Sequence, residues 1–382
     1  MIKLTNISKN TKNFLTATSI IAGTCIGAGF LGLPYVTAQS GFFISLIYLL
    51  VFGGIILLIN LYIGEIALRT KNNNHLVGYA EKYLGKAGKT IMLFATKFAI
   101  NSAIIAYIIG IGGSISFLLF GSKEYFIFVG VIFALIMSFL IWKGESFLKI
   151  FEKGGVLIAL ILLLTICLTF FDKIHTSNLL TLNFKKVLLP FGIVLFSLMS
   201  FFSIPTAKKV LNSNKVLLKK SIIVGTIIPI IFYILFILVV VGYKGSQTPE
   251  IATFGLGKLF VLIGTLTMFT SYLSLGNVLK QNYESKSNCS KKKAWFKATI
   301  IPIILFLSLQ VFEDFFSFIK ITSIGGVFSG GLVVFLVLII NKKSEILGDR
   351  NPEFKIPINR LIIIGLSIVF LFGIITELFK IY

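Results

Sequence analysis

Acidic residues, histidine and cysteine are scarce in this chain of 382 residues. It contains 14 Asp and Glu residues against 36 Lys and Arg, with two histidines and three cysteines. The cysteines have no paired spacing, so we expect neither a disulfide framework nor a metal site. His75 and His175 fall between apolar segments, which gives little support to a proton relay through imidazole.

Long polar stretches are also lacking, and this excludes a sizeable soluble domain. Hydrophobic residues make up 56% of the chain, including 39 Phe, and a transmembrane helix needs about 20 mostly apolar residues. The first apolar segment is too long for a secretory signal, and no small-x-small cleavage site follows it. The sequence therefore predicts an all-α polytopic membrane protein with a single domain, residues 1–382. We predict eleven spans, at residues 14–36, 42–67, 90–120, 125–142, 147–171, 187–206, 221–243, 254–279, 294–312, 316–340 and 360–379.

The net charge of +22 would suit a nucleic-acid partner, but the distribution of charge does not. If the N-terminus is cytoplasmic, the inner segments hold 27 of the 36 Lys and Arg residues. Such an excess of basic residues on the cytoplasmic side is typical of membrane proteins. We therefore predict a multi-pass protein of the cell membrane, with its N-terminus inside, its C-terminus outside and no nucleic-acid partner. The inner lysines are expected to contact anionic lipid head groups.

What the sequence does contain is an interrupted first span. Residues 23–34 read Gly-Thr-Cys-Ile-Gly-Ala-Gly-Phe-Leu-Gly-Leu-Pro, with four glycines and a proline in twelve positions. A broken helix at membrane depth is tolerated only where it is buried in protein or lines a polar cavity. In transporters such breaks hold the solute and the coupling ion, so this segment predicts a solute site.

The sixth span contains a second interruption, residues 196–205, which read Phe-Ser-Leu-Met-Ser-Phe-Phe-Ser-Ile-Pro. Serines three residues apart and a proline weaken a helix. The two breaks open two matching five-helix halves, residues 14–171 and 187–340, and paired breaks of this kind point to a transporter site in an inverted repeat. Residues 360–379 would form an additional helix outside the repeat. The alternative is that glycine and proline are merely common in membrane helices and serve close packing.

Residues 23–34 resemble the first-helix signature of the hydroxy and aromatic amino acid permeases. This family is part of the amino acid/auxin permease group of the amino acid–polyamine–organocation superfamily. The sixth-span run departs from the family because it has no glycine and its aromatic pair, Phe201-Phe202, is differently placed. Weaker matches occur in the family's order at Glu65 in Tyr-Ile-Gly-Glu, Tyr-Leu-Gly-Lys at 83–86, Ala-Tyr-Ile at 106–108, Ser197 through Pro205, and Thr-Ser-Tyr-Leu at 270–273.

The resemblance implies a leucine-transporter-like 5+5 inverted repeat with broken helices 1 and 6, plus an eleventh helix. It also implies amino acid uptake, normally driven by protons. We therefore expect a secondary active transporter, not an enzyme, that moves large neutral or aromatic amino acids by alternating access. It would use no cofactor besides the coupling ion.

Three other interpretations stay open. One is a transporter of the same fold for another solute, such as a polyamine or a nucleobase; a cationic substrate would usually need an acid in the cavity, and none is predicted there. A polytopic enzyme would need clustered Asp, Glu, His or Cys, and the acidic pair Glu313-Asp314 has no histidine beside it. A non-transporting sensor is not excluded, although we see no appended cytosolic domain to carry a signal.

An amino acid is a zwitterion, so its carboxylate needs hydrogen-bond donors and its ammonium group needs acceptors. In a broken first helix, free N–H groups at residues 29–31 would present the positive end of a helix dipole. Free carbonyl groups at residues 25–27 would accept from the ammonium, and glycine lets the backbone approach the substrate closely. The predicted substrate contacts are Cys25, Ile26, Gly27, Ala28, Gly29, Phe30, Leu31, Tyr107, Ser197, Ser200 and Phe201. The simpler interpretation of the aromatic ones is that they pack in the core or face lipid.

Ion coupling cannot rest on a carboxylate at the membrane midplane, because no Asp or Glu lies deep in a predicted span. Lys153 falls where proton-coupled relatives in the superfamily carry a lysine whose ammonium replaces a sodium ion. The resemblance thus implies that Lys153 carries the coupled proton, beside Thr270, Ser271 and the carbonyls of Ala22 and Cys25. The simpler interpretation is an ordinary inner-surface lysine. If sodium is used instead, Thr270 and Ser271 would be ligands.

Two further charged residues lie near the inner ends of predicted spans. Glu65 ends the second span and is a possible gate residue that pairs with basic residues of the inner loops. Lys97 lies inside the third span, and we expect its long side chain to extend to the inner surface.

Overall fold

The computed structural model describes residues 2–72, 75–143, 145–211, 214–284, 289–311 and 317–379, without the side chains of residues 2–8 and 145–156. Within these ranges every regular element is helical. Among the described residues, eight helices are long and apolar enough to cross a membrane, and a bent pair of helices would supply a ninth span. The main helices are α1 (Ile2–Cys25), α2 (Leu33–Ser40), α3 (Phe42–Arg69), α4 (Leu76–Phe120), α5 (Phe126–Trp142), α6 (Glu145–Phe170), α8 (Pro190–Leu198), α9 (Ile204–Val210), α10 (Leu217–Lys244), α11 (Lys258–Glu284), α12 (Lys291–Gln310), α13 (Phe318–Leu347) and α14 (Arg360–Phe379).

Each of the eleven predicted apolar segments contains a helix, but several bounds differ from the prediction. The largest difference is in α4, which we predicted from residue 90 and which begins at Leu76. Its first part is a more polar helix that joins the apolar part at Gly85, where φ is 69°. Glycine adopts this left-handed conformation without steric cost. The polar stretch 172–186, expected to be a plain linker, contains the short helix α7 (Thr176–Leu179).

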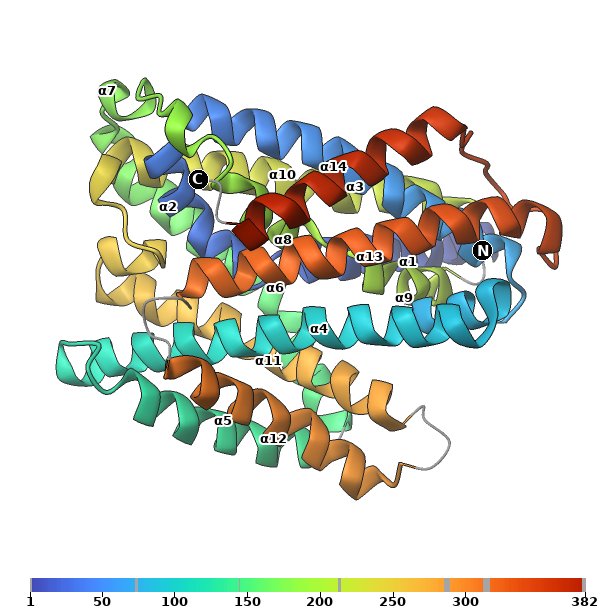
Figure 1. Cartoon of the computed structure of the whole chain (residues 1–382), viewed down its shortest axis with the longest axis horizontal. Helices are drawn as coiled ribbons and strands as arrows, with labels where there is room; N and C mark the ends of the chain where they lie inside the picture. The colour runs from blue at the N-terminus through green and yellow to red at the C-terminus, as the bar shows by residue number, and fades with distance from the viewer. Residues whose placement is uncertain are drawn as a thin grey trace.

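The helices run side by side along the long axis of the molecule (Figure 1). α13 packs against α4, α8 and α14, while α11 packs against α4 and α6, and α1 packs against α10. The α8–α9 span is 83% buried within the protein, whereas α14 is 22% buried. The center of the bundle is therefore formed around α1 and α8, and α14 lies at its edge. The start of α1 and the end of α14 lie toward opposite ends of the bundle (Figure 1).

The first span is interrupted after Cys25. Residues 26–28 are not helical, the 3-10 turn η1 (Gly29–Gly32) follows, and α2 then continues the span at an angle of 46° to α1. Two glycines permit this path because their neighbours approach closely. A Cβ on Gly27 would lie 2.6 Å from the Tyr107 hydroxyl oxygen, and one on Gly29 would lie 2.6 Å from Ser197 Oγ.

The sixth predicted span is interrupted after Leu198. Met199 is extended, with ψ at 110°, and the 3-10 turn η4 (Phe201–Ser203) leads into α9. Pro205 lies in the first turn of α9, where its missing N–H leaves no intrahelical hydrogen bond unmade. The Ser203 hydroxyl donates to the Ser200 carbonyl over 2.6 Å. The Ser203 N–H donates to the same carbonyl over 3.0 Å, so Ser203 closes the turn at the break with two hydrogen bonds.

Candidate functional site

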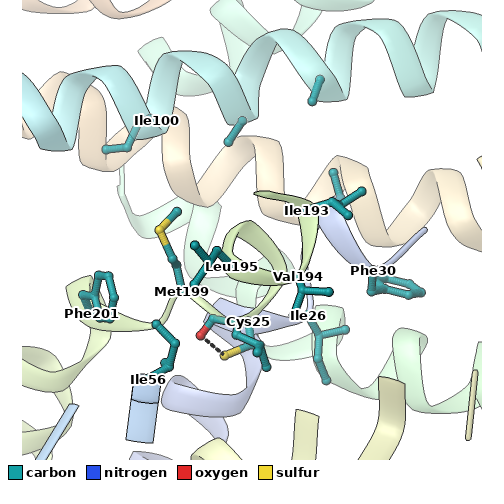
Figure 2. Packing of buried hydrophobic residues seen from close by; sticks show 14 of the residues in the cluster. Cys25, Ile26, Phe30, Ile56, Ile100, Ile193, Val194, Leu195, Met199 and Phe201 are labelled. Carbon is teal, nitrogen blue, oxygen red and sulfur yellow. Dashed lines mark hydrogen bonds between the residues drawn. The ribbon is translucent and has the colours of Figure 1, made fainter. Parts of the chain in front are cut away.

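The two interruptions meet in the middle of the bundle. The Cys25 thiol, at the end of α1, donates a hydrogen bond to the Leu198 carbonyl, at the end of α8, over 3.3 Å. The Tyr233 hydroxyl on α10 lies 2.7 Å from the Cys25 carbonyl oxygen and 2.8 Å from that of Ser197. Figure 2 shows Cys25 and Ile26 beside the residues that end α8. The carbonyl ends of two broken helices therefore share one small region.

A cavity of about 50 Å³ opens beside this region. A buried water needs about 10–15 Å³, so the cavity is large enough for a few waters and too small for an amino acid with a large side chain. In this conformation the cavity would have to widen to hold such an amino acid. Lining residues come from both interruptions, from α4 and from α11, namely Thr24, Cys25, Gly27, Ala28, Gly29, Ala99, Ile100, Ala103, Tyr107, Phe196, Met199, Phe202 and Leu275.

The lining is polar on one side and apolar on the other. The polar side is formed by the first interruption and by the Tyr107 hydroxyl, which accepts a hydrogen bond from the Ala28 N–H over 3.3 Å. The apolar side is formed by Phe196, Met199 and Phe202 together with small and branched residues of α4. A site with these two sides suits a solute that has a polar head and an apolar side chain.

The structure brings some of the predicted substrate contacts to the cavity and leaves others behind it. Cys25, Gly27, Ala28, Gly29 and Tyr107 line the cavity. The other six are largely or fully enclosed but are not among the lining residues; they are Ile26, Phe30, Leu31, Ser197, Ser200 and Phe201.

Phe30 and Phe201 show where the remaining predicted contacts go. The Phe30 ring packs against Phe232, Tyr233 and Phe236 of α10, with ring centroids 5.2–6.3 Å apart. Phe201 lies apart from Met199 in Figure 2 and is fully buried. The neighbouring Phe202 lines the cavity in its place. We could not tell these two adjacent rings apart from the sequence, because the 3-10 turn that orients them was not predictable.

Sequence reasoning also missed the α4 wall of the cavity. Ala99, Ala103 and Tyr107 follow one another at intervals of four residues, so they share one helix face. Because we had already selected Tyr107, this spacing was a usable signal for the two alanines. Because these two side chains are small, they do not fill the cavity on that side.

The second interruption is held from outside by Asn60, a buried residue in the middle of α3. Its Nδ2 donates to Ser200 Oγ over 2.8 Å and to Thr226 Oγ1 over 3.2 Å. One amide therefore connects α3, the interruption and α10. Asn60 Oδ1 is buried without a hydrogen-bond partner among the described residues, so the amide has spare acceptor capacity next to the break.

The residues predicted to couple an ion lie on three helices. Thr270 and Ser271 both donate to the Thr267 carbonyl of α11, over 2.9 and 3.1 Å, and Ser271 is also hydrogen-bonded to Tyr107. The Ala22 carbonyl accepts from the Ile26 N–H over 3.2 Å. Lys153 belongs to α6, but its side chain lies outside the described residues, so its predicted role stays a prediction.

Lys97 does not simply extend toward water. Its ammonium lies 3.9 Å from the center of the Tyr283 ring, and a cation over an aromatic face is attracted by the ring quadrupole. The side chain thus joins α4 to the end of α11.

The C-terminal end of α3 carries a hydrogen-bonded network around Glu65. The carboxylate pairs with Arg69 over 2.7 Å, one turn along the same helix, and accepts from the Ile356 N–H over 2.8 Å. We expected its partner on an inner loop, and the structure instead places the cation on α3 and a backbone donor on the loop. The buried Lys208 ammonium donates to the Thr70 carbonyl over 3.0 Å. A cation at a helix C-terminus is favourable, and Lys208 was not among the residues that the sequence singled out.

The loop that carries Ile356 is also attached by Asp349. Its carboxylate pairs with Lys82 of α4 and accepts from the Lys71 N–H over 2.9 Å. The hydrogen bond from Lys82 holds the pKa of Asp349 below its usual value. Residues 349–357 thus lie against the C-terminal end of α3 and the first part of α4. Among the described residues, no group of three or more His, Cys, Asp or Glu side chains could hold a metal ion.

Residues 10–280 match the model of the tryptophan/tyrosine permease family. The chain belongs to the tryptophan/tyrosine permease family. It is therefore a multi-pass membrane protein, in agreement with its long apolar helices. The predicted likeness to aromatic amino acid permeases is confirmed at the level of this family, while the wider superfamily placement stays a prediction.

Three relatives share sequence with this permease family member. Tyrosine-specific transport system 1 of Haemophilus influenzae is 30% identical over 224 residues, which cover 57% of this chain and 55% of that relative. Glutamine transporter 2 of Aliivibrio fischeri is 23% identical over 376 residues, which cover 92% of this chain and 95% of that relative. Tryptophan-specific transport protein of Haemophilus influenzae is 28% identical over 253 residues, with 62% and 60% covered. The chain thus matches about half of the first relative and nearly all of the second.

Proposed function

We propose that the protein is a secondary active transporter that carries amino acids, in particular large neutral or aromatic ones, across the cell membrane. The observation that carries this proposal is the meeting of two interrupted helices around a cavity with one polar and one apolar side. Backbone groups freed by such interruptions bind solutes in transporters. Relatives named for tyrosine, tryptophan and glutamine transport support an amino acid as the substrate.

The cavity suggests how a zwitterion would be oriented. The ammonium group would lie at the carbonyl ends near Cys25, and the carboxylate would lie at the N–H groups of Ala28 and Gly29 and at the Tyr107 hydroxyl. The side chain would then point to Phe196, Met199 and Phe202. Because the cavity is small, binding would widen it, which agrees with alternating access.

We further propose the leucine-transporter-like arrangement for this chain, with residues 14–171 and 187–340 as inverted repeats and residues 360–379 outside them. Each half has one interruption, and it lies in the first span of that half. The basic residues of the inner loops support an N-terminus inside the cell and a C-terminus outside. Rocking of α1, α3, α8–α9 and α10 against α4, α5, α11 and α12 would then open the cavity to either side in turn.

Protons are the coupling ion that we propose, with Lys153 as the carrier. An ammonium group that is partly buried has a lowered pKa and can titrate. Sodium, with Thr270 and Ser271 as ligands, is the competing choice. Both hydroxyls donate to the Thr267 carbonyl, and Ser271 also bonds to Tyr107, so Thr270 has more lone-pair capacity for an ion than Ser271.

Uptake into proteoliposomes tests the proposal. We would impose an inward proton gradient, with and without sodium, and measure labelled tyrosine, tryptophan, glutamine and leucine. Accumulation that needs no sodium and collapses with a protonophore is the expected result. Absence of accumulation of every amino acid, from folded and correctly inserted protein, would contradict the proposed function.

Two lysine variants separate coupling from binding. Lys153→Ala is expected to lose gradient-driven accumulation while it keeps amino acid exchange, and Lys149→Ala, one turn away on α6, is the matched control. Accumulation by Lys153→Ala at the rate of the control would remove Lys153 from the mechanism.

A further inference from the structure

The Tyr233 hydroxyl occupies a position that the proposed substrate chemistry does not explain. It lies within hydrogen-bond distance of two carbonyl oxygens, that of Cys25 at the end of α1 and that of Ser197 near the end of α8. Tyr233 itself belongs to α10, is fully buried and does not line the cavity. A group outside the cavity therefore contacts both interruptions at once.

The hydroxyl is held in place by the packing of its ring. The Tyr233 ring stacks on Phe30 of η1, with centroids 6.3 Å apart and planes 8° apart, and meets Phe232 edge to face at 5.8 Å. Phe30 in turn contacts Phe232 and Phe236. Aromatic arrangements of this kind fix ring orientation, so the hydroxyl cannot leave the carbonyls without movement of η1.

Hydrogen-bond accounting shows why this hydroxyl matters. A tyrosine hydroxyl has one proton, while two carbonyl oxygens lie 2.7 and 2.8 Å from it. The Cys25 carbonyl also accepts from the Gly27 N–H over 2.8 Å. A buried carbonyl that lacks a donor is costly, so the hydroxyl proton must serve whichever carbonyl is otherwise short of a donor.

We propose that Tyr233 is a positioning residue that joins the two interrupted helices, so that their ends move together during transport. The proposal rests on the proposed function, since it concerns the movement of the substrate site. A displacement of the second interruption away from α10 would leave the Ser197 carbonyl without this donor, and a displacement of the first would leave the Cys25 carbonyl with the Gly27 N–H alone. The hydroxyl thereby penalises states in which one half of the site has moved and the other has not.

Tyr233→Phe is the first test, and Tyr79→Phe is its matched control. Tyr79 is also buried, but its hydroxyl has no hydrogen-bond partner among the described residues. Tyr233→Phe removes a buried hydrogen-bond donor and leaves its carbonyl acceptors behind. We expect the maximal rate of amino acid uptake to fall about tenfold or more. The KM for substrate should change less than about threefold, because Tyr233 does not line the site. Tyr79→Phe should behave as the wild type.

Replacement of Tyr233 by 4-aminophenylalanine gives a second, sharper test. Its amino group carries two protons, one for each carbonyl, on a ring of the same size. We expect this variant to recover most of the wild-type uptake rate. Should Tyr233→Phe fail to fold, the 4-aminophenylalanine variant carries the test, since it preserves both the ring and the donors. A variant of this kind that folds but transports as slowly as Tyr233→Phe would overturn the proposal.

Hydrogen exchange provides a readout that does not depend on transport. In Tyr233→Phe, amide exchange is expected to rise at both interruptions, residues 25–31 and 197–204, and to stay unchanged in Tyr79→Phe. Faster exchange at one interruption alone, or at neither, would overturn the proposal. If the wild type moved no amino acid while both interruptions still responded together, the proposed function would fail and the inference about Tyr233 would stand.

Discussion

The two interruptions have the same backbone outcome but opposite causes. The first is built on small residues, because Gly27 and Gly29 are approached closely by Tyr107 and Ser197. The second contains no glycine between Ser197 and Pro205. There, the Ser203 hydroxyl donates to the Ser200 carbonyl, and the Asn60 amide donates to the Ser200 hydroxyl.

This difference separates two ways to break a membrane helix. In the first, the backbone yields space to neighbours, so added volume should be the strongest disturbance. In the second, polar side chains hydrogen-bond the break to its own backbone and to α3, so loss of a polar atom should be the strongest disturbance. The comparison can be broken by substitutions that add volume at one interruption or remove a hydrogen bond at the other.

Gly29→Ala should have the largest effect. The added Cβ would lie 2.6 Å from Ser197 Oγ, 2.8 Å from Phe196 Cδ1 and 3.1 Å from Ser197 Cα. Because a backbone atom is among these neighbours, relief requires a shift of α8, and overpacking of this kind costs about 3 kcal/mol. We expect a marked fall in the melting temperature in detergent and loss of uptake. Gly54→Ala is the control, since nothing lies within 4 Å of its added Cβ. Equal stability of the two variants would contradict our account of the first interruption.

Asn60→Ala should have the next largest effect, at the second interruption. It removes the donor shared by Ser200 and Thr226, and unmade buried hydrogen bonds cost about 1–3 kcal/mol. The measurement is the melting temperature together with the uptake rate. Asn101→Ala, on α4, removes an amide that bonds only to a carbonyl of its own helix, that of Lys97, and is expected to be milder. A larger loss in the control would show that Asn60 does not hold the interruption.

Gly27→Ala should be milder than Gly29→Ala, although it lies in the same interruption. Its Cβ meets the end of one side chain, the Tyr107 hydroxyl at 2.6 Å, while the next ring atom is 3.8 Å away. We expect destabilisation of about 1 kcal/mol. Tyr107→Phe in the same chain removes the clashing oxygen and should restore the melting temperature. Thermal unfolding of the two single variants and the double variant measures the coupling. Strictly additive losses would argue against a contact between the two positions.

The smallest effect concerns pH and lies away from both interruptions, which contain no charged residue. The hydrogen bond from Lys82 lowers the pKa of Asp349. The stability that Asp349 contributes by joining residues 349–357 to α4 is therefore fully present above the ordinary pKa of an aspartate. The attachment is lost as pH falls through the lowered pKa. Wild type and Asp349→Asn should therefore differ slightly in melting temperature at neutral pH and converge as the solution is acidified. A difference that grows on acidification would contradict this sign.

The sequence predicts the path of the chain better than the details of its center. Runs of apolar residues locate the helices, and glycine and proline locate the first interruption. The choice of Phe201 over Phe202 fails to match the cavity lining, because a 3-10 turn of three residues sets which ring faces inward. The sequence did not point to Asn60, Lys208 or Tyr233. Their roles depend on partners that are between 36 and 208 positions away along the chain. Single-chain periodicity carries no information about such contacts.

The contact between Glu65 and Ile356 has a consequence for the order in which the protein is made. These partners are 291 residues apart, so the ribosome completes most of the chain before the second one exists. Until then the C-terminal end of α3 lacks the segment of residues 349–357 that lies against it. A nascent chain stopped after α13 would hold both interruptions and the cavity, yet this end of the bundle would still be uncovered.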